Sequence, residues 1–259
     1  MQKTLRVPVR PLIDDLAPMS SLRVEYENGS PAFLKQIDWL NAHGFTYIRR
    51  TRGDGDCFYR SFGFTYVERL LQSPDRELAV SRSLKSLQST NQKLESAGIQ
   101  ALVFEDFLDV FTSLIEGIVK PGNEGGTLNA EGLLKAFQSD EGRLISNATV
   151  MYLRLLTSAQ ILLDRDFFQS FVVHPDTKEP MDVDSFCANF VQALGKEADN
   201  VEMNALCSAL ELNLDVAYLN GGRTGVVDFI EFRSDANPEA DPLMLLYRPG
   251  HYDILVRAS

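Results

Sequence analysis

The hydrophobic pattern changes period along this 259-residue chain, and the change limits the folds that the chain can adopt. Through the middle of the chain, apolar residues recur at the three- and four-residue spacing of helices. Near the C-terminus they alternate at 213–218 and form short runs at 243–247 and 252–256, and one further strand is expected at 46–50. This order predicts an α+β fold in which a small sheet packs between helices.

Local signals define the expected helices and the last turn. Ser30 is a favoured N-cap residue and Pro31 a favoured first helical residue, so a helix is predicted from there to Gly44. Helical spacing predicts further helices over 57–71, 104–118, 146–163, 184–194 and 201–211, with a Gly-rich loop at 121–129. The sequence Arg-Pro-Gly-His between the last two strands predicts a hairpin turn.

The first 22 residues are interrupted by Pro8, Pro11 and Pro18 and are expected to form an N-terminal arm, residues 1–22. No composition break or repeat divides the rest, so 23–259 is predicted to be a single domain. No apolar run approaches the ~20 residues of a membrane helix, and the basic start of the chain lacks the apolar core of a signal peptide. These features predict a cytoplasmic protein, with the nucleus as a further compartment.

The charge balance and the cysteine count narrow the classes of partner and site. Thirty-six acidic residues against 25 basic ones give a net charge of −11, which argues against nucleic acid or an anionic membrane as partner. Three cysteines exclude a disulfide framework and indicate a reducing compartment. Cys187 and Cys207 have apolar neighbours and are expected in the core. The scattered cysteines and histidines predict no metal site, and no cofactor is expected.

The remaining cysteine, Cys57, follows a turn-forming sequence, Gly-Asp-Gly-Asp, and is the first residue of a predicted helix. The positive end of a helix favours a thiolate, and its free N–H groups can bind a developing oxyanion. The two glycines of the turn would let backbone approach a substrate closely. The same pattern also fits a capped turn, in which Asp54 or Asp56 accepts hydrogen bonds from helix N–H groups.

A thiol nucleophile needs a base, and the chain has three histidines. His43 is expected at the end of a helix, where the dipole favours it, and His174 in an exposed loop. His251 opens a strand, and Asp253 follows two residues later on the same face. An aspartate beside an imidazole fixes its tautomer and stabilises its charged form, so His251 is the expected base.

Two segments, DGDCFYRSFGF (54–64) and LLYRPGHYDIL (245–255), resemble the otubain family of ovarian-tumour-type (OTU) deubiquitinating cysteine proteases. VMYLRLLTS (150–158) and the run at 186–212 fall between them in the order that this family shows, so the resemblance covers roughly 25–259. It implies a papain-like OTU fold with a small, mostly antiparallel sheet between helical lobes. It also implies hydrolysis of isopeptide bonds after the C-terminal glycine of ubiquitin, on polyubiquitin chains.

The resemblance implies roles for individual residues. Cys57 matches the nucleophile, His251 the general base and Asp253 the acid that orients the histidine. Asp54 matches an aspartate that holds the turn and supplies a backbone N–H to the oxyanion hole. Substrate binding is expected at four residues beside these, Gly55, Asp56, Gly250 and Tyr252.

The chain departs from the family pattern in the turn and at its N-terminus. Asp56 stands where the family usually has asparagine, and like-charge repulsion there would disfavour a thiolate at Cys57. Gly53 replaces a common proline, which loosens the entry to the turn. The arm is short, so a second, proximal ubiquitin site and the linkage preference stay open.

Ubiquitin and polyubiquitin chains are the expected partners of a monomeric enzyme. The tail of ubiquitin carries arginines, so acidic residues are expected to line the substrate channel. The candidates are Asp184, Glu197, Asp199 and Glu202, although these residues also fit a solvated helix face. Two alternatives stay open. The chain could bind a ubiquitin-charged conjugating enzyme and block chain synthesis without catalysis, or it could be an α+β scaffold with an inert Cys57.

Overall fold

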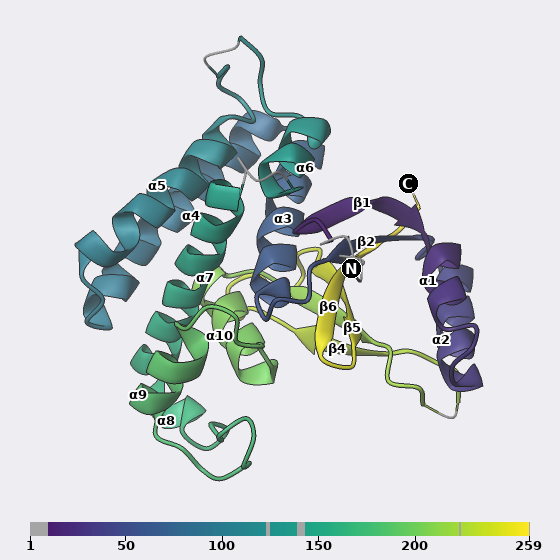
Figure 1. Cartoon of the computed structure of the whole chain (residues 1–259). Coiled ribbons are helices and arrows are strands. Elements are labelled where there is room, and N and C mark those ends of the chain that lie inside the picture. The colour runs from purple at the N-terminus through teal and green to yellow at the C-terminus, as the bar shows by residue number, and fades with distance from the viewer. Residues whose placement is uncertain (1–9, 123–124, 139–142, 223, 259) are drawn as a thin grey trace, which may run out of the picture.

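The computed structural model describes residues 10–122, 125–138, 143–222 and 224–258. Within them, a six-stranded sheet runs in the order β1-β2-β6-β5-β3-β4 (Figure 1). Its strands are β1 (Ile13–Pro18), β2 (Tyr47–Thr51), β3 (Leu214–Tyr218), β4 (Asp228–Phe232), β5 (Leu243–Arg248) and β6 (His251–Val256). The pair β3 and β5 is parallel and the other neighbouring pairs are antiparallel, which confirms the expected mostly antiparallel sheet.

Helices cover both faces of this sheet. One face packs against α1 (Met19–Glu25) and α2 (Pro31–Ala42). The other face packs against a larger helical lobe, made of α3 (Cys57–Gln72), α4 (Arg76–Ser96), α5 (Ala101–Glu116), α6 (Ala130–Gln138), α7 (Arg143–Leu163) and α10 (Asn200–Leu210). Short α8 (Arg165–Phe168), α9 (Val183–Phe186) and a π-helical turn (Cys187–Val191) lie between α7 and α10.

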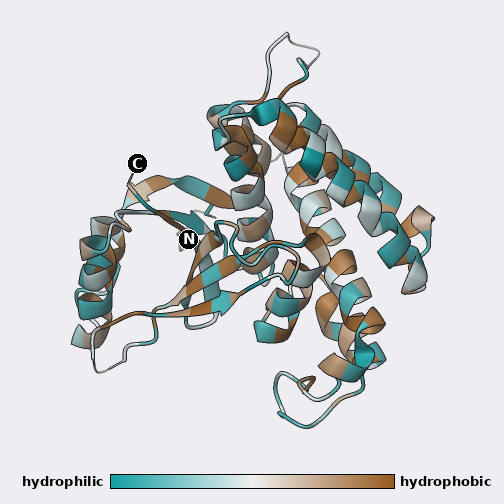
Figure 2. Ribbon diagram, turned by 180° about the vertical axis from the view of Figure 1, so that it is seen from behind, coloured by the Kyte–Doolittle hydropathy of each residue, from teal (hydrophilic) through white to brown (hydrophobic). Residues whose placement is uncertain are grey.

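Successive residues of the central strands divide between the two faces. Leu245 and Ile254 belong to the core under the large lobe, whereas Leu246 and Leu255 belong to the core under α1 and α2. Because alternate side chains of a strand point to opposite faces, an apolar run can supply both cores at once. Figure 2 shows the result, with apolar residues along the central strands and both apolar and polar residues on the long helices.

The strongest local signals are confirmed. The Ser30 hydroxyl accepts a hydrogen bond from the Ala32 N–H and caps α2, which starts at the expected proline. Pro249 and Gly250 form the two-residue turn between β5 and β6, with Gly250 at a φ of 72°. Cys187 and Cys207 are buried, as expected. The predicted helix at 184–194 is instead divided into α9 and the π-helical turn.

Six of the described elements were not expected from the sequence, namely α1, α4, α6, α8, β1 and β4. Helix α4 buries Val80, Leu87 and Leu94 with two hydroxyl residues between them, so its apolar stripe is thin. Strand β4 lies at one edge of the sheet and buries only Phe232, and β1 lies at the other edge. Edge strands with one buried residue show no alternation for the sequence to reveal.

The expected arm at 1–22 is wrong from Ile13 onward. Residues 13–18 pair with β2 through an irregular register, and α1 begins directly afterwards at Met19. The prolines prevent a long helix there, but they permit an edge strand, where one N–H faces solvent. Residues 1–9 lie outside the described part of the chain. Among the helices that the structure describes, none is long and apolar enough to cross a membrane.

Candidate active site

Strand pairing brings the two ends of the sequence together at Cys57. Strand β2 pairs with β6, and its last residue, Thr51, donates its N–H to Asp253 Oδ1 over 2.9 Å. The turn after β2 then reverses through Gly55, which has a φ of 83°. Cys57 follows as the first residue of α3 and is 3% exposed. As an N-terminal helical residue, it has an N–H that no carbonyl of the same helix can accept.

The β5–β6 hairpin carries the histidine and aspartate. His251 Nε2 lies 2.9 Å from Asp253 Oδ1, so the two side chains share a face of the strand as expected. The opposite side of the imidazole faces the turn before Cys57, since a Cβ atom at Gly53 would lie 3.5 Å from His251 Nδ1. Tyr252 points to the other face and packs edge-on against Phe58 of α3. One imidazole nitrogen therefore binds the aspartate and the other is directed towards the turn.

Asp253 is fully buried and its carboxylate accepts hydrogen bonds on both oxygens. Besides its bonds to Thr51 and His251, it accepts one from Arg248 Nε over 2.8 Å, and Arg248 Nη2 forms an ion pair with the same oxygen at 2.7 Å. Burial alone would raise the pKa of Asp253, but these donors hold the pKa below its ordinary value. The aspartate is therefore ionised and fixed in place beside the histidine.

His251 has a strongly perturbed pKa. Burial alone would lower the pKa of His251, but the hydrogen bond to Asp253 and the interactions with Asp253 and Cys57 outweigh burial and raise it to about 9. At neutral pH the imidazole is therefore protonated next to the Cys57 sulfur. A positive charge at this position stabilises a negative charge on the sulfur.

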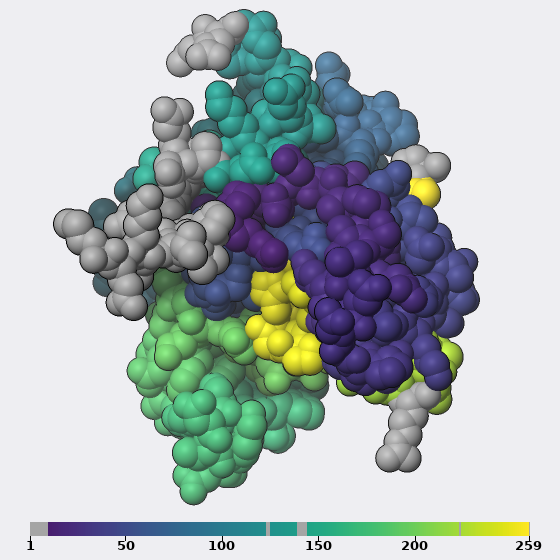
Figure 3. Space-filling view, turned by 45° about the vertical axis from the view of Figure 1, so that its right-hand side comes forward, coloured from purple at the N-terminus to yellow at the C-terminus, as the bar shows by residue number. Residues whose placement is uncertain are grey.

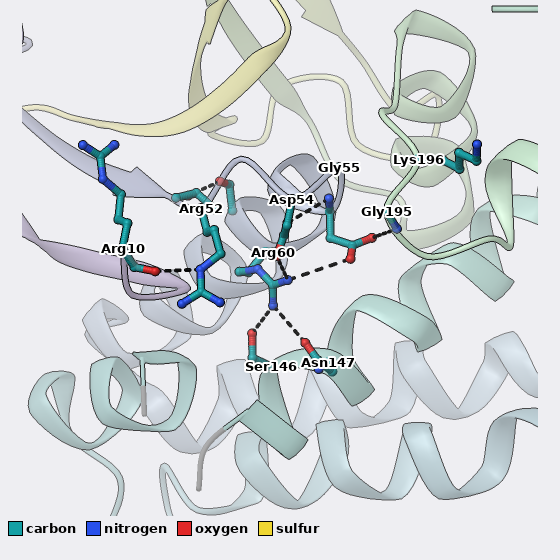
Figure 4. A network of polar contacts seen from close by, with 12 residues as sticks. Arg10, Arg52, Asp54, Gly55, Arg60, Ser146, Asn147, Gly195 and Lys196 are labelled. Carbon is teal, nitrogen blue, oxygen red and sulfur yellow. Dashed lines mark hydrogen bonds and ion pairs between the residues drawn. The ribbon is translucent and has the colours of Figure 1, made fainter. Parts of the chain in front are cut away.

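Asp54 holds the turn, as expected. Its Oδ1 accepts the Asp56 N–H over 3.0 Å, and its Oδ2 accepts from Arg60 Nη2 over 2.9 Å. Arg60 is buried and also donates to Ser146 and Asn147 (Figure 4). The expected oxyanion N–H of Asp54 is not free in this structure, because it donates to the Arg52 carbonyl over 3.1 Å.

Asp56 is not an unpaired charge beside Cys57, because a buried arginine pairs with it. Its Oδ1 accepts from Arg154 Nη2 at 2.6 Å, from Arg154 Nε at 3.0 Å and from the Gly195 N–H at 3.0 Å. The Arg154 side chain is completely buried, so a full positive charge opposes the carboxylate within a protein environment. The sequence missed this partner, although a single arginine within the apolar run of α7 is a signal for a buried ion pair.

A cleft of about 700 Å³ adjoins the hairpin. Of the four residues expected in substrate binding, Gly250 and Tyr252 line this cleft, whereas Gly55 and Asp56 are not among its lining residues. Tyr218 and Tyr247, which the sequence did not single out, line it as well. Figure 3 shows the hairpin (yellow) at the surface between the N-terminal elements (purple) and the segment after α7 (green).

Three of the four acidic candidates line the cleft, namely Glu197, Asp199 and Glu202. Asp199 and Glu202 also form the capping box of α10, so part of their role is structural. Burial raises the pKa of Glu202 to about 7. The fourth candidate, Asp184, instead pairs with Arg165 on the surface.

The other two histidines lie in the settings that the sequence predicts. His43 caps the end of α2, stacks on Trp39 and contacts the Trp39 carbonyl through Nδ1. His174 lies in the loop after α8 and packs against Phe190. His251 is thus the histidine that the structure brings to the turn before Cys57.

The family model of the otubain peptidases, Peptidase C65, matches residues 6–257. The chain belongs to the otubain family. An Arabidopsis thaliana ovarian tumour domain-containing deubiquitinating enzyme 1 is 35% identical over 256 residues, covering 95% of this chain and 80% of the relative. The human ubiquitin thioesterase OTUB1 is 33% identical over 247 residues, covering 95% of this otubain and 83% of the relative.

Solved otubain structures share the fold. An OTUB1 complex with ubiquitin aldehyde and UBC13~Ub has a TM-score of 0.80 at 27% identity and covers 96% of this chain and 92% of its own. A related complex with UBCH5B~Ub has a TM-score of 0.82, also at 27% identity, with 96% and 91% covered. This otubain is therefore a ubiquitin thioesterase, a deubiquitinase of the cysteine peptidase class with an α+β fold.

Proposed function

We propose that this otubain cleaves isopeptide bonds after the C-terminal glycine of ubiquitin in polyubiquitin chains, with Cys57 as nucleophile, His251 as general base and Asp253 as the orienting acid. The observation that carries the proposal is the 2.9 Å contact of His251 with the buried Asp253, on a strand held beside the Cys57 turn. A nucleophile, a base and a group that orients the base are the parts that thiol catalysis requires.

The reaction follows from these positions. His251 takes the Cys57 proton, and the thiolate attacks the carbonyl of the terminal glycine of ubiquitin. The Cys57 N–H at the start of α3 donates a hydrogen bond to the oxyanion. The Asp54 N–H becomes a second donor when its hydrogen bond to the Arg52 carbonyl is broken. His251 then gives its proton to the departing lysine amine. A water that loses its proton to His251 hydrolyses the thioester and restores the thiol.

The cleft beside the hairpin is the proposed site for the ubiquitin tail. Its carboxylates, Glu197 and Asp199, suit the arginines of that tail, and Gly250 leaves space for a narrow peptide. The tyrosines Tyr218 and Tyr247, which stack with ring centroids 4.5 Å apart, provide a flat wall. We propose that Gly250 and Tyr252 act in substrate binding and that Gly55 and Asp56 support the turn instead.

A panel of differently linked diubiquitins tests this function and identifies the linkage. The wild type should cleave at least one of them, while Cys57→Ala and His251→Gln should not. Failure of the wild type on every linkage would contradict the proposed reaction. Cleavage retained by Cys57→Ala would remove that residue as the nucleophile.

A second candidate function is binding of a ubiquitin-charged conjugating enzyme, since solved OTUB1 complexes include UBC13~Ub and UBCH5B~Ub. At the start of α5, Leu102 is 88% exposed and Val103 49% exposed, and this apolar pair is the proposed docking surface. Cys57→Ala should then still inhibit chain synthesis, and Leu102→Arg should not. Leu144→Arg, at a residue that is 75% exposed on α7, is the matched control. Equal inhibition by the three variants would reject the α5 surface.

We further propose that 23–259 form one catalytic domain, to which β1 adds an edge strand, and that the enzyme acts as a monomer. The proposed site combines residues 54–57 with 251–253, so a domain boundary between them is disfavoured. Cytoplasm and nucleus are the proposed compartments. Light scattering of the purified chain and imaging of a tagged copy test these points; a dimer mass or a secreted product would contradict them.

A further inference from the structure

We propose that Arg154 is a positioning residue for the reaction, which acts with Asp56 to hold the nucleophile turn against the segment that forms one wall of the cleft. We call residues 192–199, between the π-helical turn and α10, the cleft loop. The inference rests on the proposed function, because it concerns how the same site meets ubiquitin.

The Arg154 guanidinium donates to both segments at once. On the side of the turn it donates to Asp56 Oδ1 and, over 3.1 Å, to the Gly55 carbonyl. On the other side it donates to the Lys196 carbonyl over 2.5 Å and to the Val191 carbonyl, at the start of the cleft loop, over 2.9 Å. The side chain is fully buried and lies 4.4 Å from the centre of the Tyr59 ring. A planar group with five donors fits such a junction, and lysine does not.

The two segments also touch directly. The Gly195 N–H donates to Asp56 Oδ1 over 3.0 Å, although the two residues are 139 positions apart in the sequence. A Cβ atom at Gly55 would lie 2.2 Å from the Gly195 carbonyl oxygen, so the two backbones are in contact. In Figure 4 the loop that carries Gly195 and Lys196 lies beside the turn that carries Gly55.

Both segments lead directly into functional positions. One residue after Asp56 is Cys57, and one residue after Lys196 is Glu197 on the cleft wall. We call Arg154 and Asp56, with their contacts to Gly55, Gly195 and Lys196, the clamp. The clamp fixes the distance between the nucleophile and the wall that meets the ubiquitin tail. It does not hold the His251–Asp253 pair, since Asp253 is held by Arg248 and Thr51.

Because the clamp holds the turn and the cleft loop but not the His251–Asp253 pair, experiments can distinguish a positioning role of Arg154 from a general structural role. Loss of the clamp should impair the reaction with a ubiquitin substrate, which needs the cleft wall, and should spare alkylation of Cys57 by iodoacetamide, which does not. Asp56→Asn keeps an oxygen for Arg154 and Gly195, whereas Asp56→Ala removes it. Asparagine should therefore rescue what alanine loses.

The experiment measures kcat and KM on a fluorogenic C-terminal amide of ubiquitin, and the rate of Cys57 alkylation by peptide mass spectrometry. Arg154→Lys and Asp56→Ala should lower kcat/KM by about 10- to 100-fold, with a raised KM, because small displacements of a site cost factors of this order. Alkylation should stay within about twofold of the wild type, and Asp56→Asn should stay within about threefold in both assays. Arg165→Met, which breaks a surface pair with Asp184, is the control with unchanged activity.

Distinct outcomes overturn distinct statements. Unchanged kcat/KM in Arg154→Lys, alkylation that falls in parallel with kcat/KM, or equal loss in Asp56→Ala and Asp56→Asn would each reject the clamp. If Arg154→Lys does not fold, the two Asp56 variants give the answer alone. A wild type that is alkylated normally but does not hydrolyse the ubiquitin amide would reject the proposed function, and the clamp with it.

Discussion

Replacement of Asp253 by asparagine isolates the charge that the structure places behind His251. The shape of the side chain is retained, and its Oδ1 can still accept from Thr51 N–H and His251 Nε2, both at 2.9 Å. The other atom becomes an amide nitrogen that faces Arg248, which in the wild type donates to Oδ2 over 2.8 Å and forms an ion pair with it at 2.7 Å. The variant therefore removes the negative charge and leaves the positive one in place.

The expected magnitude follows from the pKa of His251, which the site raises from 6.5 to about 9. A shift of about 2.5 pH units corresponds to about 3.4 kcal/mol in favour of the imidazolium. Asp253 and Cys57 together produce this shift, so loss of the Asp253 charge should lower the pKa of His251 by about 1–2 units, or ~1.4–2.7 kcal/mol. At pH 7.5 the protonated fraction of His251 would then fall from about 97% to between about three quarters and one quarter.

Histidine-labelled protein and NMR titration of the ring protons measure this pKa directly, with His251→Gln to assign the signal. The kcat/KM for a ubiquitin substrate should fall by at least about tenfold in Asp253→Asn. Asp215→Asn, which makes the same change in a residue paired with Arg233, is the control. A His251 pKa that stays within about 0.3 units of the wild type in Asp253→Asn would refute the reasoning, whatever happens to the rate.

Three further predictions follow from the same contacts. Because the pKa of His251 is raised in the folded protein, its stabilising contribution of about 3 kcal/mol is complete below pH 6.5 and is lost as the pH rises through 9. In urea unfolding, the difference in unfolding free energy between the wild type and His251→Gln should shrink over that pH range, and a difference that does not change with pH would contradict this. Gly55→Ala should destabilise the protein by more than ~1 kcal/mol, since it combines a left-handed φ with a 2.2 Å clash against Gly195; an unchanged thermal midpoint would argue against that contact. Asp199→Asn should raise the KM for ubiquitin substrates by about two- to tenfold with little change in kcat, because it removes one carboxylate of the cleft; an unchanged KM would separate Asp199 from the ubiquitin tail.

The sequence predicts those features that depend on neighbours in the chain. Ser30 and Pro31 indicate the start of α2, and Pro249 and Gly250 predict the hairpin turn. His251 and Asp253 share a face because successive side chains of a strand point to opposite sides. Contacts across the chain could not be predicted in this way. The partner of Asp56 is Arg154, 98 residues away, and without that partner the carboxylate resembles an unpaired charge beside the thiol.

Elements with few buried apolar residues could not be predicted from the sequence either. Strands β1 and β4 occupy the two edges of the sheet, and α4 places hydroxyl residues within its buried stripe. Their positions are fixed by what they pack against, and their own hydrophobic period is too weak to identify them. The cleft tyrosines Tyr218 and Tyr247 were missed for a related reason, since their neighbourhood arises from the parallel pairing of β3 with β5.

The central claim is that Cys57, activated by His251, attacks the C-terminus of ubiquitin. Its most direct test is incubation of the purified chain with ubiquitin that carries a C-terminal electrophile, followed by mass spectrometry of the digested adduct. The account predicts one ubiquitin per chain, attached to the peptide that contains Cys57, and no adduct with Cys57→Ala. No adduct with the wild type, or an adduct on Cys187 or Cys207, would contradict it.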